Sequence, residues 1–183
     1  TTREVIPALD SIARRALSLL NAGTVAFYLL QEDGETIKVV TAQGAYQKEM
    51  TSHTIKIGEG ITGSIIASGR PEIVDDITKD PRKKTVPGTP KEDARLDTMM
   101  SAPLILHGKS IGAINAWRLK SNGLFDKSEL NFLVSIAHQA SISIESVRLF
   151  QETTRRAQEA TAIAEVGRDI SATLQLDLVL ERI

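Results

Sequence analysis

The glycine spacing Gly58-x-Gly60-x-x-Gly63 is the arrangement in this chain closest to a known chemical motif. It follows a predicted strand and begins a predicted helix. It also precedes Asp75 at about the distance found in dinucleotide-binding proteins, which place a pyrophosphate on the helix N-terminus. The predicted helix, residues 61–68, is shorter than the dozen or more residues of a parallel crossover. A glycine turn that folds this helix onto a sheet explains the same spacing. A dinucleotide-binding enzyme fragment therefore stays an alternative hypothesis.

Other residue types with reactive or metal-binding chemistry are scattered. The three histidines, His53, His107 and His138, include no pair with metal-ligand spacing on one helix face. The sequence has no cysteine, which excludes disulfides, thiolate nucleophiles and cysteine metal sites. No Ser/His/Asp order or pair of acidic residues has the pattern of a catalytic site. We therefore predict no catalytic residues, no metal and no cofactor, and we expect this chain not to be an enzyme.

Composition places the chain among ordinary globular proteins. It has 183 residues, of which 42% are hydrophobic and 25% charged, and its net charge is −1. This balance does not attract nucleic acid or an anionic membrane surface. No apolar run approaches the roughly 20 residues that a membrane span needs, and no signal peptide is visible. We expect a cytoplasmic protein without nucleic-acid partners and without direct membrane contact.

The periodicity of apolar residues predicts helices and strands in a definite order. Residues 5–19 have helical spacing, and two sequential hairpins follow from the turns at Asp33-Gly34 and Gly108-Lys109. An Asp126-to-Glu129 capping box begins a long helix. The remaining predicted segments are strands at 24–31, 36–42, 53–57, 72–75, 98–106 and 110–119, the helix 61–68 and a loop at 76–97. Sequential hairpins indicate an antiparallel sheet with flanking helices, an α+β fold.

Several short motifs in this order resemble the GAF domain family over roughly residues 3–152. They are Ile57-Gly58-Glu59-Gly60-Ile61-Thr62-Gly63, Asp80-Pro81-Arg82, Ala102-Pro103-Leu104-Ile105 with Gly108, Ile111-Gly112-Ala113, and Phe125-Asp126 with Glu129-Leu130. The resemblance implies a six-stranded antiparallel sheet of the GAF/PAS-like kind. It also implies helices on one face and a small-molecule pocket on the other face beneath loops. Such domains occur in histidine kinases of two-component systems, cyclic-dinucleotide enzymes, phosphodiesterases and transcription regulators.

Comparison within this family narrows the chemistry. GAF-like methionine sulfoxide reductases use cysteines, and relatives that bind bilin commonly attach the pigment through cysteine, a residue this chain lacks. Members that bind cyclic nucleotides carry an Asn-Lys pair, a Phe and an Asp-Glu pair. The corresponding positions here hold Arg118-Leu119, Phe125 and Glu129-Leu130, so only Phe125 matches.

The long polar loop at residues 76–97 is the expected lid of a pocket, because resembling domains use this region to cover one. We predict a cavity between the loop and the sheet face that carries Trp117 and Met99. The candidate ligand-binding residues are Asp75, Arg82, Arg95, Met99, Ser101 and Trp117. Two other interpretations remain open. The loop's basic residues would be solvated and balanced by nearby aspartates, and Trp117 and Met99 would simply fill the core.

The C-terminal part of the chain has features of a long signalling helix. Neither Gly nor Pro occurs at positions 127–166. Two apolar stripes follow spacings of three and four: Leu133, Ala137, Ala140, Ile144 and Val147, then Ala160, Ile163, Gly167, Ile170 and Leu174. This repeat suits a seam between two parallel helices, although the first stripe also suits packing on the chain's own sheet. We expect a parallel homodimer.

These patterns predict a sensor domain at residues 1–155. Residues 156–183 would be a helical linker and the truncated start of a following module. The predicted function is non-catalytic: an unknown small molecule or partner binds, and the terminal helices relay its state to an output domain of the same chain, such as a histidine kinase or cyclic-dinucleotide enzyme. A ligand-free dimerisation scaffold is a further alternative.

Overall fold

The computed structural model describes residues 2–51, 53–84 and 97–180. The chain divides into two compact units, Thr1–Glu145 and Ser146–Ile183. The division lies inside a continuous helix, ten residues before the boundary expected at residue 155.

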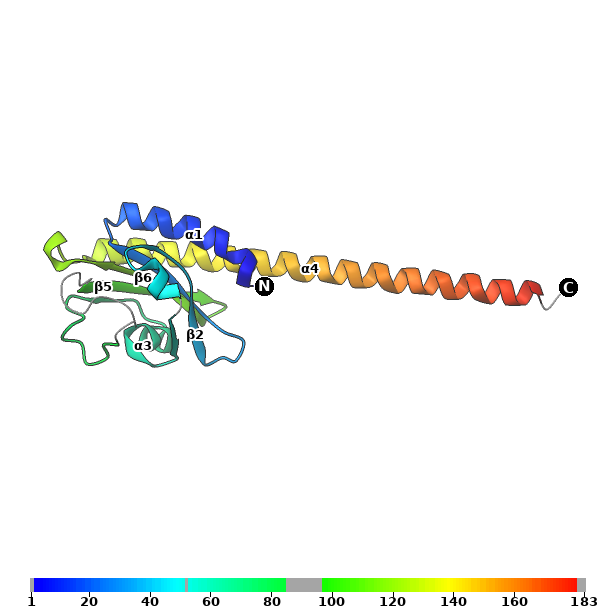
Figure 1. Ribbon diagram of the computed structural model, residues 1–183, viewed down its shortest axis with the longest axis horizontal. Coiled ribbons are helices and arrows are strands. Elements are labelled where there is room, and N and C mark those ends of the chain that lie inside the picture. Colours follow the sequence, from blue (N-terminus) through cyan, green and yellow to red (C-terminus); the bar gives the residue numbers. More distant parts are fainter. Residues whose placement is uncertain (1, 52, 85–96, 181–183) are drawn as a thin grey trace. The chain divides into compact units, whose positions relative to one another are not determined.

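The first unit is built on an antiparallel sheet with the strand order β3-β2-β1-β6-β5-β4 (Figure 1). The strands are β1 (Thr24–Leu30), β2 (Thr36–Gly44), β3 (Thr54–Lys56), β4 (Glu72–Val74), β5 (Thr98–Leu106) and β6 (Lys109–Arg118). Every neighbouring pair is antiparallel. The predicted six-stranded antiparallel α+β architecture is confirmed.

The centre of the sheet is the pairing of β1 with β6, which are distant in sequence. β1 is buried along almost its whole length, and β6 is buried from Gly112 to Arg118. Their close approach requires a glycine, because a Cβ added to Gly112 would lie 2.1 Å from the carbonyl oxygen of Tyr28. Side chains alternate between the two faces, so Ala113, Asn115 and Trp117 share one face of β6.

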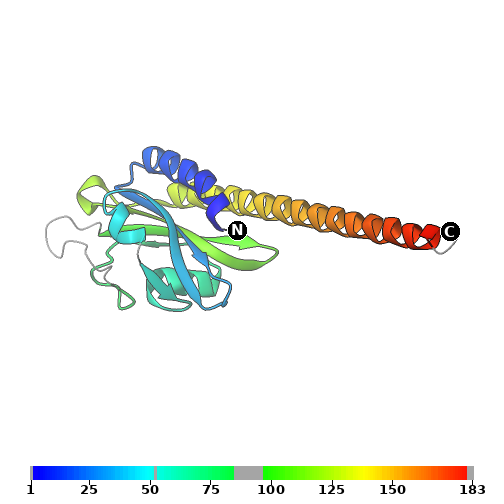
Figure 2. The same ribbon diagram turned by 45° about the vertical axis from the view of Figure 1, so that its right-hand side comes forward.

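Helices cover both faces of this sheet (Figures 1 and 2). On one face lie α1 (Thr2–Leu19) and the first part of α4 (Lys127–Leu180), which are side by side in both views. The other face carries the nine-residue α3 (Gly60–Ser68), whose Ile61, Ile65 and Ile66 are buried in one cluster with residues of the sheet. Two short helices were not predicted from the sequence, α2 (Gln47–Thr51) and the 3-10 helix η1 (Lys120–Asn122). Their five and three residues are too few to show a helical period of apolar side chains.

The start of α4 is fixed by the predicted capping box, which is confirmed. The Asp126 N–H donates to Glu129 Oε2 at 2.9 Å, and the Glu129 N–H donates to Asp126 Oδ1 at 2.8 Å. The other carboxylate oxygen of Glu129 accepts from Arg118 at 2.6 Å. Arg118 also donates to the carbonyl oxygen of Leu20 and lies over the Phe125 ring, 4.0 Å from its centroid. One buried guanidinium therefore ties the end of β6 to the end of α1 and the beginning of α4.

The first apolar stripe of α4 packs inside the domain. Leu133 and Ala140 are fully buried and Ala137 is 1% exposed, so this part of the predicted seam is intramolecular. Ile144 and Val147 are half-buried. In the second unit Ala160 and Ile163 are exposed, whereas the exposure of Gly167, Ile170 and Leu174 is outside what the structure describes.

Across the described residues, no helix is both long enough and apolar enough to cross a membrane.

Candidate ligand-binding site

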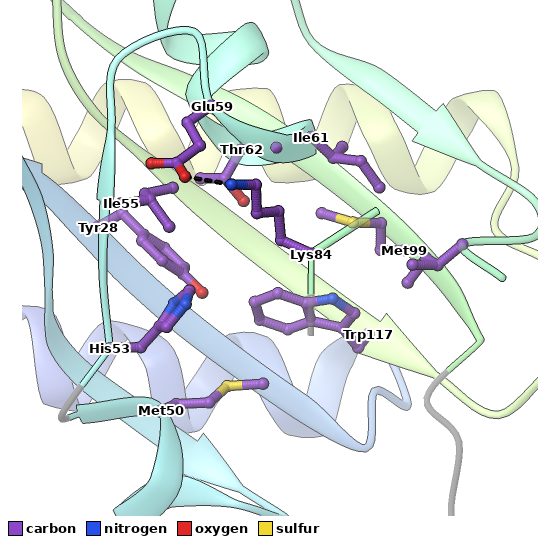
Figure 3. Close-up of a pocket in the computed structure, with 12 residues that line it drawn as sticks. Tyr28, Met50, His53, Ile55, Glu59, Ile61, Thr62, Lys84, Met99 and Trp117 are labelled. Atoms are coloured by element: carbon purple, nitrogen blue, oxygen red, sulfur yellow. Dashed lines mark hydrogen bonds and ion pairs between the residues drawn. The ribbon is translucent and has the colours of Figure 1, made fainter. Parts of the chain in front are cut away.

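A cavity lies between α3 and the face of the sheet that carries Trp117 (Figure 3). It has a volume of about 90 Å³ and is partly open to solvent. Its lining residues come from four strands, two helices, the loops on either side of β3 and the loop after β4: Tyr28, Met50, His53, Ile55, Glu59, Gly60, Ile61, Thr62, Ile77, Lys84, Met99 and Trp117.

The floor of the cavity is aromatic and apolar. Tyr28 of β1 and Trp117 of β6 lie with their ring centroids 6.4 Å apart and their planes tilted by 54°. Met99 of β5 pairs in register with Trp117, and Met50 of α2 completes this floor (Figure 3). These four side chains are exposed by no more than 8%. Such a surface favours a flat, apolar ligand, because aromatic rings and thioethers make favourable contacts with ring faces and edges.

Neutral polar groups of His53, Tyr28 and Thr62 interrupt this apolar lining. His53 Nδ1 is buried and has no hydrogen-bond partner among the described residues. Burial lowers the pKa of His53 despite the opposing charge of Glu59, so its imidazole is neutral at pH 7. Burial also raises the pKa of the Tyr28 hydroxyl, which keeps it protonated. An unpaired buried nitrogen costs free energy, and a ligand that hydrogen-bonds to it recovers that cost.

An ion pair between Glu59 and Lys84 forms the charged part of the lining (Figure 3). The second carboxylate oxygen of Glu59 accepts the Lys56 N–H at 2.8 Å. The hydrogen bond from Lys84 and then that from Lys56 lower the pKa of Glu59, so the carboxylate stays ionised. Because the two charges cancel, the pair brings no net charge to the cavity.

Three of the residues predicted from the sequence lie in or next to this cavity. Met99 and Trp117 line it. Ser101 is fully buried and donates to Asn115 Oδ1 at 2.6 Å. Asn115 in turn donates to Thr62 Oγ1 at 2.7 Å, and Thr62 does line the cavity. Ser101 is therefore connected to the cavity through the network that holds α3 on the sheet.

Of the other predicted residues, Arg82 and Asp75 are not among those that line the cavity. Arg82 forms a two-pronged contact with Glu72 at 2.6 and 3.0 Å and also binds Asp80 at 2.7 Å. These carboxylates, Glu72 first, raise the pKa of Arg82, and they occupy most of its donors. Asp75 is exposed to solvent. Arg95 lies outside the described residues.

Tyr28, Met50, Glu59 and Lys84 were not predicted as site residues from the sequence, and His53 was weighed there only as a metal ligand. Alternation along β1 would have placed Tyr28 on the cavity face had the facing of that strand been known. No local signal pairs Glu59 with Lys84, because 25 positions separate them.

The comparisons with known proteins agree with this architecture. A family model described as GAF domain matches residues 4–145. This chain belongs to the GAF domain family. A Nif-specific regulatory protein from Azospirillum brasilense is 25% identical over 94% of this chain and 28% of its own length. A second one, from Herbaspirillum seropedicae, is 26% identical over 91% of this chain and 31% of its length. The chain thus spans about three tenths of the length of these two curated relatives.

Solved structures show the same fold. The GAF domain of a phosphoenolpyruvate-protein phosphotransferase from Coxiella burnetii aligns with a TM-score of 0.71 and 22% identity, covering 81% of this chain and 86% of that one. A free methionine-R-sulfoxide reductase from Neisseria meningitidis, solved in complex with its substrate, aligns with a TM-score of 0.66 and 21% identity. That alignment covers 79% of this chain and 80% of the reductase.

The glycine motif of this GAF domain is a turn. Gly58 and Gly60 have positive φ angles of 76° and 68°, and the Gly58 N–H donates to the Gly63 carbonyl oxygen at 3.0 Å. The helix that follows, α3, connects β3 to β4, which are the two opposite edges of the sheet. A dinucleotide fold needs a parallel strand pair around its crossover helix, and the described sheet is antiparallel throughout. The topology therefore favours the turn over the dinucleotide-binding alternative.

Metal coordination has no evident place in the part of the chain that the structure describes. No group of three or more His, Asp or Glu residues there has the arrangement to hold an ion.

Proposed function

We propose that this GAF domain is a non-catalytic sensory module of a larger regulatory protein, working in the cytoplasm. A small molecule enters the cavity beside Trp117, and α4 relays the occupied state to an output domain of the same chain. The observation that carries this proposal is a mostly apolar cavity, with an unpaired histidine nitrogen in its wall, in a domain homologous to part of regulatory proteins. Mostly apolar pockets with a few fixed polar groups are typical of small-molecule sites.

The relay has a structural basis in β6. Trp117 lines the cavity on one face of this strand, and the adjacent Arg118 holds the start of α4 on the other face. A ligand that moves Trp117 therefore acts on a strand that also carries the anchor of α4. Such a ligand shifts the population between two arrangements of α4, provided that it binds one of them more tightly.

Filling the cavity should mimic an occupied site. The variant Ile55→Phe places a ring into the lining, and we expect it to change amide hydrogen exchange in α4 by about fivefold or more, the lower end of typical coupling between sites. The measurement is exchange of α4 peptides by mass spectrometry, corrected for the change in global stability. The control is Ile105→Phe, because Ile105 is exposed and lies away from the cavity. Unchanged exchange in the cavity variant would contradict the relay.

We also propose that the domain forms a parallel homodimer through the second part of α4. Leu149, Phe150 and Ile163 are exposed by 54%, 73% and 74%. Leaving such side chains in water costs roughly 25 cal/mol per Å² of apolar surface, and a partner helix removes part of that cost. Parallel pairing would align two copies of the output domain. The alternative is a ligand-free dimerisation scaffold, which would also pair through α4 but would bind no small molecule in the cavity.

The dimer is tested by introducing a charge into the proposed seam. We expect the wild-type chain to sediment as a dimer at tens of micromolar, and Ile163→Glu to sediment as a monomer, because it buries a carboxylate between helices at a cost of several kcal/mol. Gln158→Glu is the matched control, since it adds the same charge on the opposite side of the helix and should remain dimeric. A wild-type chain that is monomeric at high micromolar concentration would remove this part of the proposal.

A further inference from the structure

The lining of the cavity restricts the chemical class of its ligand. Its size is the first restriction. An apolar protein cavity of about 150 Å³ admits benzene. The present cavity measures about 90 Å³ and is partly open, so it limits the enclosed part of a ligand to about one ring. A dinucleotide or a multi-ring pigment is too large for this space.

Charge is the second restriction. Within the described lining, the ionised side chains are Glu59 and Lys84, and each neutralises the other. An anionic ligand would have to compete with Glu59 for Lys84, while a cation would compete with Lys84 for Glu59. A charged ligand also loses its hydration on entering an apolar site, and neither charged side chain of the lining is free to compensate this loss. The lining therefore selects a neutral molecule.

Shape and hydrogen bonding complete the description. The tilted rings of Tyr28 and Trp117 and the thioether of Met99 present flat, polarisable surfaces. His53 Nδ1 is buried without a partner and requires a donor or an acceptor, depending on the imidazole tautomer. A hydroxyl group serves either tautomer, because it both donates and accepts. A ring with one hydroxyl matches the flat apolar surfaces and supplies the missing hydrogen bond of His53.

We propose that the ligand of this GAF domain is a small, neutral, single-ring aromatic molecule whose hydroxyl-type group hydrogen-bonds to His53 Nδ1. The proposal rests on the proposed function in one respect, namely that the cavity is a ligand site. It adds the ligand class and the residue that recognises the polar group.

The test uses simple probes and the only tryptophan of the chain, Trp117, which lines the cavity. Phenol, benzene, cyclohexanol and benzoate are titrated into the full chain. Binding is followed by Trp117 fluorescence, excited at the red edge of the indole absorption, and by calorimetry. We expect phenol to bind about tenfold more tightly than benzene, the equivalent of one buried hydrogen bond. Phenol should also bind more tightly than cyclohexanol, which is not flat, and than benzoate, which is charged.

The variant His53→Phe removes both ring nitrogens and keeps a flat side chain. It should abolish the preference for phenol over benzene while still binding benzene, and retained benzene binding shows that the cavity is intact. The matched control is His138→Phe, because His138 is exposed on α4 and should leave the preference unchanged.

The outcomes separate the ligand class from the sensory role. Benzoate or cyclohexanol binding as tightly as phenol would overturn the neutral aromatic class and leave the cavity as a site for another molecule. A phenol preference that survives in His53→Phe would overturn the role of His53. Absence of binding by all four probes would overturn the proposal. Failure of the relay is detected separately, as unchanged α4 exchange in Ile55→Phe.

Discussion

Replacing Arg118 by methionine is expected to lower the free energy of unfolding by about 3 kcal/mol, the lower end of the range for breaking a buried ion pair by removing one partner. The Arg118 side chain is 7% exposed and that of Glu129 is 27% exposed, so Glu129 keeps some access to water after the change. The variant also leaves the Leu20 carbonyl oxygen without its donor and removes the guanidinium from the Phe125 ring. Methionine retains most of the side-chain volume, so lost packing contributes little.

Urea unfolding of the two proteins, followed by circular dichroism, measures this difference. The control is Arg14→Met, because Arg14 is exposed and pairs with Asp10 four positions away on α1. A surface pair of this kind contributes about 0.5 kcal/mol or less. Equal losses in the two variants would mean that Arg118 is not the anchor between β6, α1 and α4.

A methyl group at Gly63 should also destabilise the domain strongly. The Cβ of Gly63→Ala would lie 2.5 Å from the carbonyl oxygen of Lys56 and 3.2 Å from the amide nitrogen of Gly58. Both neighbours are backbone, so the turn or α3 must shift, and overpacking of this kind costs about 1–3 kcal/mol. The companion variant Gly58→Ala meets nothing within 4 Å and suffers only from a φ of 76°. That conformation costs an L-residue about 1–2 kcal/mol.

These two variants test whether the glycine motif is a structural turn or a pyrophosphate site. We expect a loss of about 3 kcal/mol for Gly63→Ala and about 1 kcal/mol for Gly58→Ala by thermal or urea unfolding. Neither variant should change calorimetric titrations with NAD or FAD, in which no binding is expected. If wild type bound NAD tightly and Gly60→Val removed that binding, the motif would be a pyrophosphate site and the turn interpretation would be wrong.

Much of the fold follows from local sequence patterns. Alternation and turn residues predicted the hairpins β1–β2 and β5–β6, because each hairpin depends on residues that are close in sequence. The capping box at Asp126 was predictable for the same reason. Alternation along β6 also placed Trp117 and Asn115 on one face of this strand, and Trp117 on that face lines the cavity.

The pairing of distant segments was not predictable from such patterns. Nothing local places β1 beside β6, or puts β3 and β4 at opposite edges, although α3 joins them directly. The cavity depends on this order, since Tyr28 and Trp117 meet only because their strands are neighbours. The contacts of Arg82 were also not predictable from local patterns. A basic loop suggests anion binding, whereas Glu72 and Asp80 already occupy that guanidinium in the fold.

The apolar stripes of α4 show most clearly which features the sequence determines and which features depend on the tertiary structure. The sequence by itself determined that residues from 127 onward form a helix with apolar positions at spacings of three and four, because helical periodicity is a property of the local chain. It could not determine which surface each stripe covers, since a sheet and a partner helix select the same spacing. Only the tertiary structure decided that Leu133, Ala137 and Ala140 cover the sheet of their own domain and that Ile163 stays exposed. The physical reason is that burial depends on distant segments brought together by folding, and spacing along one helix carries no information about them.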